Sequence, residues 1–525
     1  MHEHNNYSII PFGNLVPIEK RFSVNEPVVR FYELMKKLKL SSYLKSGNVY
    51  EKRGRKKIRR QNILMAIIFA FSMNIRSTRD ILEACKYDTR LIALLGGVEI
   101  KSHNTIAHMI NEIKDIDKLL KDINILIFSE DKEVNMDEVY IDGTKIEAYA
   151  NKYTFVWKNA VLKNQIKLNA KINLIIDDIN NLFRLYNFDI IEKKEKYDSQ
   201  ILLSLLLNLK KIIENNNIEL VKGKGKRKTD IQKLFDYVDE YTSKMQEYEM
   251  HLSIIGNNRN SYSKTDHDAT FMRMKEDYML NGQLKPAYNL QIGICNGYTV
   301  VLNLFQDRTD FATFIPLLKQ YKDLYGKYPK YPVADAGYGN YENYSFCEKN
   351  NIELYQKYTM YSYEKSPKIK KNKFSKDKFK FIVDKVYCPN KKEMEFVRYQ
   401  NDFTFEGAQP TKIYKSNHCL KCKFRKQCTK SSTGRTIQIN EDFERLKNIA
   451  KTNLDSENGI RLRVNRSIQV EGFFAILKQD SKYNTLYRRS MEKAKLELSL
   501  IAIGQNIKRY LYWSSIKYEI KNAEK

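Results

Sequence analysis

The spacing of apolar residues changes near residue 135, and this change constrains the fold more than any other feature of the chain. From residue 28 to about residue 130, apolar side chains recur at three- and four-residue steps, as they do in amphipathic helices. After residue 138, short runs rich in Val, Ile and Tyr appear between Gly, Asp and Asn, and such runs favour strands. A helical region followed by alternating strands and helices predicts an α/β protein with a helical N-terminal domain.

Helices are expected over three N-terminal stretches, 31–40, 61–73 and 104–120. Ser77 is expected to cap the helix through Ile81, and Ser102 the helix that begins near Asn104, because a serine hydroxyl can accept from a free N–H of the first turn. Two short helices joined by a turn in a basic neighbourhood are typical of a DNA-binding helix-turn-helix, although plain bundle packing gives the same pattern.

Four strands are expected in the rest of the chain, at 139–141, 288–294, 298–305 and 331–334. A helical hairpin is expected between the first two strands, with arms at 202–213 and 231–241 joined by the basic loop KGKGKRK. The segment 310–324 has helical periodicity and lies between the last two strands. This alternation indicates that strands and helices share one core.

The pattern divides the chain into four parts. They are a helical domain (1–135), the first part of the core (136–362) with a helical insertion at about 160–262, a basic insertion that contains cysteines (363–440), and a helical C-terminal part (441–525). The basic insertion is expected to be rich in loops and to lack an apolar core. A bound metal would give such a segment stability that burial does not supply.

The chain is strongly basic, with 91 Lys and Arg residues against 63 Asp and Glu residues and a formal net charge of +28. Such a surplus favours a polyanionic partner, because Lys and Arg that neutralise phosphates release bound counterions. Residues 51–60 hold seven bases against one acid, and residues 364–380 hold eight against two. A composition rich in Lys, Asn and Ile throughout would also raise the charge, but the clustering of the bases favours nucleic acid.

The apolar and cysteine contents exclude two classes of protein. The longest uninterrupted apolar run, residues 63–71, has nine residues and is too short to cross a bilayer. The N-terminus has no basic segment followed by an apolar stretch, so no secretion signal is expected. Seven cysteines in 525 residues do not form a disulfide framework. A cytoplasmic protein is expected, not a membrane protein or a secreted scaffold.

Three acids stand out by their context. Asp142 is expected to close the first strand and Asp335 the last, and Glu471 lies in the helical stretch VNRSIQVEGFFAILK. Phosphodiester cleavage with two metal ions needs carboxylates that converge on cations about 4 Å apart, and strand ends plus a helix laid across the sheet can supply them. Each acid alone has a plainer interpretation, since an Asp after a strand is often only a turn former.

Five segments carry a resemblance to a known family: IDGTKIEAYANKYTFVWK (141–158), KTDHDATFMRMKEDYMLNGQLKPAYNLQIG (264–293), VADAGYGNYENYSF (333–346), IRSTRDILEAC (75–85) and GGVEIKSHNTIAHMI (96–110). They resemble the DDE transposases of bacterial insertion sequences, from about residue 27 to about residue 510. The resemblance implies an RNase H-like mixed sheet as the catalytic core, preceded by a helical DNA-binding domain and interrupted by the helical and the basic insertions.

The resemblance also implies three catalytic acids that hold Mg2+, or Mn2+ in its place: Asp142, Asp335 and Glu471. The family pattern around the Glu, Y-x2-R-x3-E-x6-K, is met in part. Arg466 and Lys478 fit the Arg and the Lys as DNA-binding residues, but Arg463 stands where Tyr is expected. Four residues, not three, separate Arg466 from Glu471.

The implied reaction is hydrolysis at the ends of a mobile element, followed by attack of the freed 3′-OH on target DNA. The implied partners are double-stranded DNA, as terminal inverted repeats and as target, and a second copy of the chain in a homodimer. Five bases of the N-terminal block are expected to contact DNA: Arg55, Lys56, Lys57, Arg59 and Arg60. Two alternatives stay open, namely a non-catalytic DNA-binding protein derived from a transposase and a divalent-metal nuclease that cuts without joining.

Four cysteines of the basic insertion predict a structural zinc site: Cys388, Cys419, Cys422 and Cys428. Thiolates at the two-residue spacing of Cys419 and Cys422 suit tetrahedral Zn2+. The first ligand is distant in the sequence and the last pair is spaced by five residues, so His418 is an alternative ligand. Four reduced thiols without a metal are the other interpretation.

Overall fold

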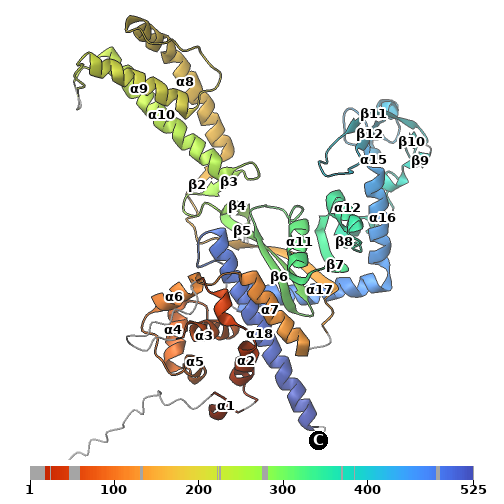
Figure 1. Ribbon diagram of the computed structural model, residues 1–525. Coiled ribbons are helices and arrows are strands. Elements are labelled where there is room, and N and C mark those ends of the chain that lie inside the picture. The colour runs from red at the N-terminus through yellow and green to blue at the C-terminus, as the bar shows by residue number, and fades with distance from the viewer. Residues whose placement is uncertain are drawn as a thin grey trace, which may run out of the picture.

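The computed structural model describes residues 18–523 apart from 24, 46–58, 131–133, 222, 224–225, 275–281, 368–370, 383–384 and 481–484. It is a mixed α/β protein with two projecting insertions (Figure 1). Arg55, Lys56 and Lys57 of the predicted DNA-binding block lie outside the described residues. No helix within the described ranges combines the length and the apolar character needed to traverse a lipid bilayer.

A six-stranded mixed sheet forms the centre of the protein. Its strands are β1 (Glu138–Glu147), β4 (Thr270–Arg273), β5 (Leu284–Cys295), β6 (Tyr298–Phe305), β7 (Tyr331–Gly339) and β8 (Tyr355–Tyr358). The order is β6-β5-β1-β7-β8. The short strand β4 pairs with the start of β5, on the same edge as β6. β5 is antiparallel to β1 and β6, whereas β1, β7 and β8 are parallel. The expected α/β class and mixed sheet are confirmed.

Both strands that carry the predicted aspartates run past them, so the expectation that these acids end their strands is wrong. β1 continues to Glu147 because it pairs with β5 along its length. Gly143 does not make a turn here; a Cβ at this position would lie 2.1 Å from Gln291 Nε2, so the glycine leaves room for a side chain of β5. β7 continues to Gly339, whose missing Cβ lets the backbone lie close to the carbonyl of Lys357 on β8.

The N-terminal helices are α1 (Ile18–Arg21), α2 (Pro27–Lys36), α3 (Arg60–Ser72), α4 (Thr78–Tyr87), α5 (Thr89–Leu94), α6 (His103–Asn111) and α7 (Ile116–Glu130). The expected caps are confirmed, since the Ser77 and Ser102 side chains accept from backbone N–H groups two or three residues on. The expected single helix over 104–120 is wrong. Backbone hydrogen bonds between Lys114 and Tyr43 and between Lys45 and Glu112 replace the helical ladder there.

The C-terminal helix α18 (Met491–Ala523) completes the N-terminal bundle by packing against α3 and α7. Gly504 makes this contact close, because a Cβ there would lie 2.6 Å from the backbone of Phe71. A buried amide pair, Asn124 and Asn506, joins α7 to α18, and both amides also bond to the backbone of Thr299 on β6. The first and last segments of the chain therefore share one apolar core with the sheet.

Helices cover both faces of the sheet, and the alternation along β1 decides which side chain faces which layer. Tyr140 faces α18 and α17 (Glu457–Ala475), whereas Val139 and Ile141 face α11 (Phe314–Tyr325), α12 (Tyr341–Lys349) and α16 (Glu441–Asp455). α17 lies against β1 and β7. Since Asp142 follows Tyr140 by two residues, it lies on the α17 face.

The helical insertion is a long arm between β1 and β5 (Figure 1). It contains three helices where a hairpin of two was expected: α8 (Lys158–Leu185), α9 (Ser199–Asn215) and α10 (Asp230–Ile255). A two-stranded sheet at its base, β2 (Phe155–Trp157) with β3 (Ser261–Ser263), joins the arm to the core. The arm has its own apolar core, which includes Ile176, Phe183 and Leu205.

The basic insertion lies at the far end of α16 and is a small sheet, not a set of loops (Figure 1). Its strands are β9 (Lys380–Ile382), β10 (Lys385–Tyr387), β11 (Glu393–Gln400), β12 (Thr411–Lys415) and β13 (Thr436–Ile439). The expectation that it lacks an apolar core is wrong. Alternating residues such as Val386, Met394 and Tyr414 bury one face and pack on Ile437 and Ile439.

Candidate functional site

Asp142 and Asp335 lie side by side on adjacent parallel strands. β1 and β7 pair with Tyr140 opposite Val333, and two further residues along each strand bring the two aspartates together on the same face. Each carboxylate is oriented by its own strand: Gly143 N–H donates to Asp142 Oδ1 and Gly337 N–H donates to Asp335 Oδ1, both at 2.8 Å. The other oxygen of each carboxylate, Oδ2, faces a basic side chain that both aspartates share.

That partner is Arg466, which reaches the pair from α17. Its Nη2 lies 2.9 Å from Asp142 Oδ2 and 3.8 Å from Asp335 Oδ2, and its Nε donates to the carbonyl of Ile141 at 3.1 Å. The side chain of Arg466 is 13% exposed and that of Asp142 19%, whereas that of Asp335 is 44% exposed, so Asp335 is the most accessible of the three. One positive charge thus contacts both carboxylates.

The same geometry tests whether the pair suits a metal ion. The outer oxygens of both carboxylates lie within 4 Å of one guanidinium nitrogen, and carboxylate oxygen is the ligand that Mg2+ prefers. The residues present therefore fit the metal that the family pattern implies. They supply two ligands from neighbouring strands, which is fewer than the three acids expected from the sequence.

Glu471 does not lie with the other two acids. It is exposed on α17, five residues after Arg466, which puts it about 140° around the helix from the side that faces the aspartates. Within the described part of the chain, no three His, Cys, Asp or Glu side chains converge closely enough to hold a metal ion. The structure brings together Asp142, Asp335 and Arg466, and the role of Glu471 stays a prediction.

Three other predicted DNA-binding residues are among the described residues: Lys478, Arg59 and Arg60. Lys478 is half-buried in the π-helical turn Ile476–Asp480 that follows α17. Arg463, which stands where the family pattern has Tyr, lies over the ring of Tyr361, 5.7 Å from its centroid. Arg60 forms an ion pair with Glu112 at 3.6 Å, and Arg59 is exposed next to it at the start of α3.

Two charged residues near the site were missed in the sequence. Lys357 on β8 has a lowered pKa because burial disfavours its charge, and the positive charges of Arg466 and Arg463 lower it further. Asp310 lies in the turn between β6 and α11. Neither residue belongs to a motif with recognisable spacing, because both reach the site only through the order of strands in the sheet.

Tyr338 on β7 is close enough to the charged residues of the site for them to change its pKa. Its pKa is raised well above the usual range by burial first, and then by the negative charges of Asp310, Asp142 and Asp335, while Arg466 opposes them. Its hydroxyl donates to Gln291 Oε1 on β5. The pKa of this buried side chain therefore depends on three acids and one base.

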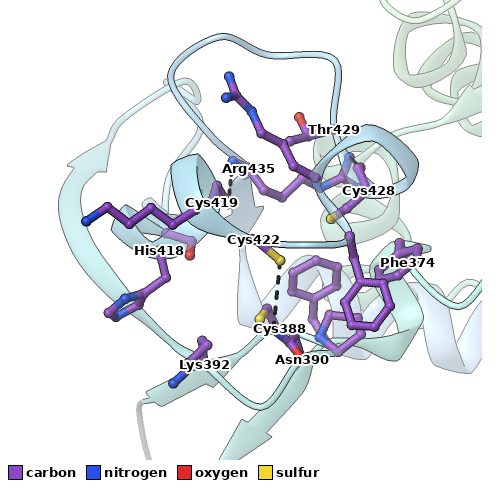
Figure 2. A pocket seen from close by; sticks show the side chains of 16 residues that line it. Phe374, Cys388, Asn390, Lys392, His418, Cys419, Cys422, Cys428, Thr429 and Arg435 are labelled. Carbon is purple, nitrogen blue, oxygen red and sulfur yellow. Dashed lines mark hydrogen bonds between the residues drawn. The ribbon is translucent and has the colours of Figure 1, made fainter.

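The four cysteines of the basic insertion line one cavity of about 210 Å3 (Figure 2). The amide of Asn390 donates to Cys422 Sγ at 3.8 Å, and the backbone N–H of Arg435 donates to Cys419 Sγ at 3.3 Å. Burial raises the pKa of Cys428, and the charges of the other three cysteines raise it further while Arg435 opposes them. The structure thus brings all four predicted thiols together.

This convergence is looser than a metal site requires. The cysteines are among the described residues, and no group of three ligands in that part of the chain stands at metal-binding distances. The imidazole of His418 lines the cavity but points away from the sulfurs (Figure 2). Zinc in this cavity stays a prediction.

Two family models match the chain. The Transposase domain (DUF772) matches residues 16–112, which are the N-terminal helices, and the Transposase DDE domain matches residues 387–511, from the basic insertion through Arg466 and Glu471 into α18. Asp142 and Asp335 lie outside both matches. No curated protein and no solved structure matches the chain. The two matches, which follow the chain order of a helical domain and then a DDE domain, indicate an insertion-sequence DDE transposase.

Proposed function

We propose that this chain cleaves DNA at the ends of a bacterial insertion sequence and joins the freed 3′-OH to target DNA. The observation that carries the proposal is the pair of aspartates on β1 and β7, with both outer oxygens facing one cationic group. A phosphodiester is itself an anion, so two bare carboxylates would repel it unless cations lie between them. Paired acids at a helix-covered sheet thus suit metal-assisted phosphoryl chemistry.

We infer that the sheet is an RNase H-like core. The strand order β6-β5-β1-β7-β8, with β5 antiparallel to its neighbours and the last three strands parallel, supports this assignment. In this arrangement β1 and β7, the first and fourth of these five strands along the chain, are adjacent. The aspartates of β1 and β7 are 193 positions apart in the sequence but neighbours in the sheet.

Asp142 and Asp335 would hold Mg2+, or Mn2+, with Glu471 as the predicted third ligand. When bound, the metal supplies charge stabilisation for the attacking and leaving oxygens of the phosphodiester. The chain itself orients the two carboxylates through the N–H groups of Gly143 and Gly337. Arg466 approaches from α17 and would bind a phosphate oxygen next to the acids.

DNA binding would rest on the surplus of positive charge, and a homodimer on DNA in the cytoplasm is part of the proposal. The charge is distributed along the chain, and part of it lies in the basic insertion at 364–380. Because α3 and α18 share a core, DNA binding is best measured on the whole chain, not on a fragment that ends at residue 135.

The experiment that tests the proposal supplies the full chain and Mg2+ with a duplex that carries one end of the DNA element encoding the chain, plus a supercoiled plasmid. The expected result is cleavage at the end and covalent joining of the 3′ end to the plasmid. Cleavage without joining would favour the nuclease alternative. Binding without cleavage would favour the non-catalytic alternative. Either result would overturn the proposal.

A further inference from the structure

Behind the two aspartates, on the other side of β1, lies a polar cluster to which the proposed reaction assigns no part. Successive residues of a strand point to opposite faces, so Asp142 faces α17 while the position of Gly143 faces the layer of α11 and α12. A Cβ at Gly143 would meet Gln291 Nε2 at 2.1 Å and Asp310 Oδ1 at 3.1 Å. The glycine therefore lets a carboxylate come directly behind the strand that carries Asp142.

Asp310 is held in this place by side chains of β5. Its Oδ1 accepts from Asn289 Nδ2 at 2.9 Å and from Gln291 Nε2 at 2.8 Å, and both amides are buried. Gln291 in turn accepts from the hydroxyl of Tyr338, three residues after Asp335 on β7. The carboxylate is thus tied to both strands that carry the aspartates.

The other oxygen of Asp310 faces Asp335. A Cβ at Gly337 would lie 3.1 Å from Asp335 Oδ1 and 3.4 Å from Asp310 Oδ2, so both oxygens border the same small space. The carboxylate of Asp310 is thus close to that of Asp335, and Arg466 contacts Asp335 together with Asp142.

We propose that Asp310 is a positioning residue whose fixed negative charge strengthens cation binding by Asp142 and Asp335. This inference rests on the proposed function, because the cation is the one used in cleavage. Asp310 lies behind β1, on the opposite face of this strand from Asp142. Its charge acts across the strand, where the partly buried surroundings screen it less than water would. Two buried amides, those of Asn289 and Gln291, hold the Asp310 carboxylate in place, and the hydroxyl of Tyr338 in turn holds Gln291.

The test separates the charge of Asp310 from its hydrogen bonds. Asp310→Asn keeps the Oδ1 acceptor and the size of the side chain but removes the charge. Asn289→Ala removes one hydrogen bond and keeps the charge. Asp307→Asn is the matched control, because it removes a carboxylate three residues away in the same turn. Mn2+ binding to the full chain without DNA is measured from the paramagnetic resonance signal of free Mn2+, together with the thermal unfolding midpoint.

We expect Asp310→Asn to weaken Mn2+ binding by about tenfold, with an unchanged unfolding midpoint. Asn289→Ala and Asp307→Asn should leave the affinity within about twofold of the unaltered chain. In cleavage assays, Asp310→Asn should raise the Mg2+ concentration for half-maximal rate while the rate at saturating Mg2+ is retained.

Two results would overturn the inference: Mn2+ affinity unchanged by Asp310→Asn, or weakened as much by Asn289→Ala as by Asp310→Asn. The second would show that the cluster is only structural. A failure of the proposed function looks different. In that case Asp142→Asn would bind Mn2+ as well as the unaltered chain does, whatever Asp310→Asn does.

Discussion

The protein has two places where the sequence predicted a metal, and the structure assembles them in opposite ways. The cysteines that line the cavity of the basic insertion come from a stretch of 41 residues, and all four meet there. The acids on the central sheet are spread from residue 142 to residue 471, and two of the three meet. Arg466 lies beside them.

Side chains that lie far apart along the chain are harder to assign to one site from the sequence than side chains that lie close together. Cys419 and Cys422 are joined by a short turn, so their spacing alone puts the two thiols near each other. Asp142 and Asp335 depend on the pairing of β1 with β7. A helical residue such as Glu471 depends also on the rotation of α17, which is set by the packing of Leu462, Val470 and other side chains on the sheet.

The largest expected effect is that of the sheet carboxylates on the rate of strand cleavage. Asp335→Asn keeps the size of the side chain and weakens a metal ligand, so we expect the rate of strand cleavage to fall by roughly 10³-fold or more. Glu471→Gln should have an effect as large if α17 rotates when DNA and metal bind. The measurement is single-turnover cleavage of an end-bearing duplex in Mg2+.

Glu457→Gln is the matched control, because it neutralises an exposed acid in the first turn of the same helix. A Glu471→Gln chain that cleaves at the normal rate would contradict the family assignment of the third acid. It would leave Asp142, Asp335 and Arg466 as the complete set.

The next effect concerns the cysteine cavity. Cys419→Ser with Cys422→Ser should abolish zinc binding and loosen the small sheet, because its core has few apolar side chains and a structural zinc contributes on the order of 10 kcal/mol in small domains. Elemental analysis of chain purified without added metal should find about one zinc. Limited proteolysis should show new cleavage in the basic insertion, while the three-helix arm, which has a larger core, stays resistant.

A chain that contains no zinc and yet resists proteolysis in the basic insertion would contradict the zinc prediction. The cavity would then hold four reduced thiols, and the sheet would be stable through its apolar core, which includes Val386, Met394 and Tyr414.

The smallest expected effect is on the pH dependence of stability, and it comes from a buried carboxylate for which no metal is predicted. Glu497 on α18 is 4% exposed and accepts from the backbone N–H of Tyr487 at 3.0 Å. Burial raises its pKa to about 8 from the usual 4.5, against the opposing effects of that N–H, the N–H of Arg488 and the charge of Arg76. The folded chain therefore holds a proton that the unfolded chain releases between these two pH values, and stability is lost as pH rises through this window.

Glu497→Gln removes that loss. We expect the variant to be more stable than the unaltered chain at pH 9, by roughly 2–4 kcal/mol, and close to it at pH 5. The measurement is the difference in thermal unfolding midpoint between the two chains at each pH. An equal difference at both values would show that Glu497 does not change protonation on folding.

The sequence alone determined the class of the fold, because periodicity is a local property. Strands over 298–305, the caps at Ser77 and Ser102, and the amphipathic helix after residue 310 all follow from the residues that form them. The limits of β1 and β7 did not follow, because Asp followed closely by Gly predicts a turn only where no neighbouring strand continues the pairing.

Only the tertiary structure decided which charges meet at the site. Arg466 lies between the aspartates because α17 crosses β1 and β7, and Asp310 lies behind them because Gly143 leaves room for Gln291. Likewise, the N-terminal helices depend on α18, more than 350 residues later in the chain, for part of their core. Contacts of this kind depend on strand order and on small residues at points of close approach, and no pattern of neighbouring residues encodes them.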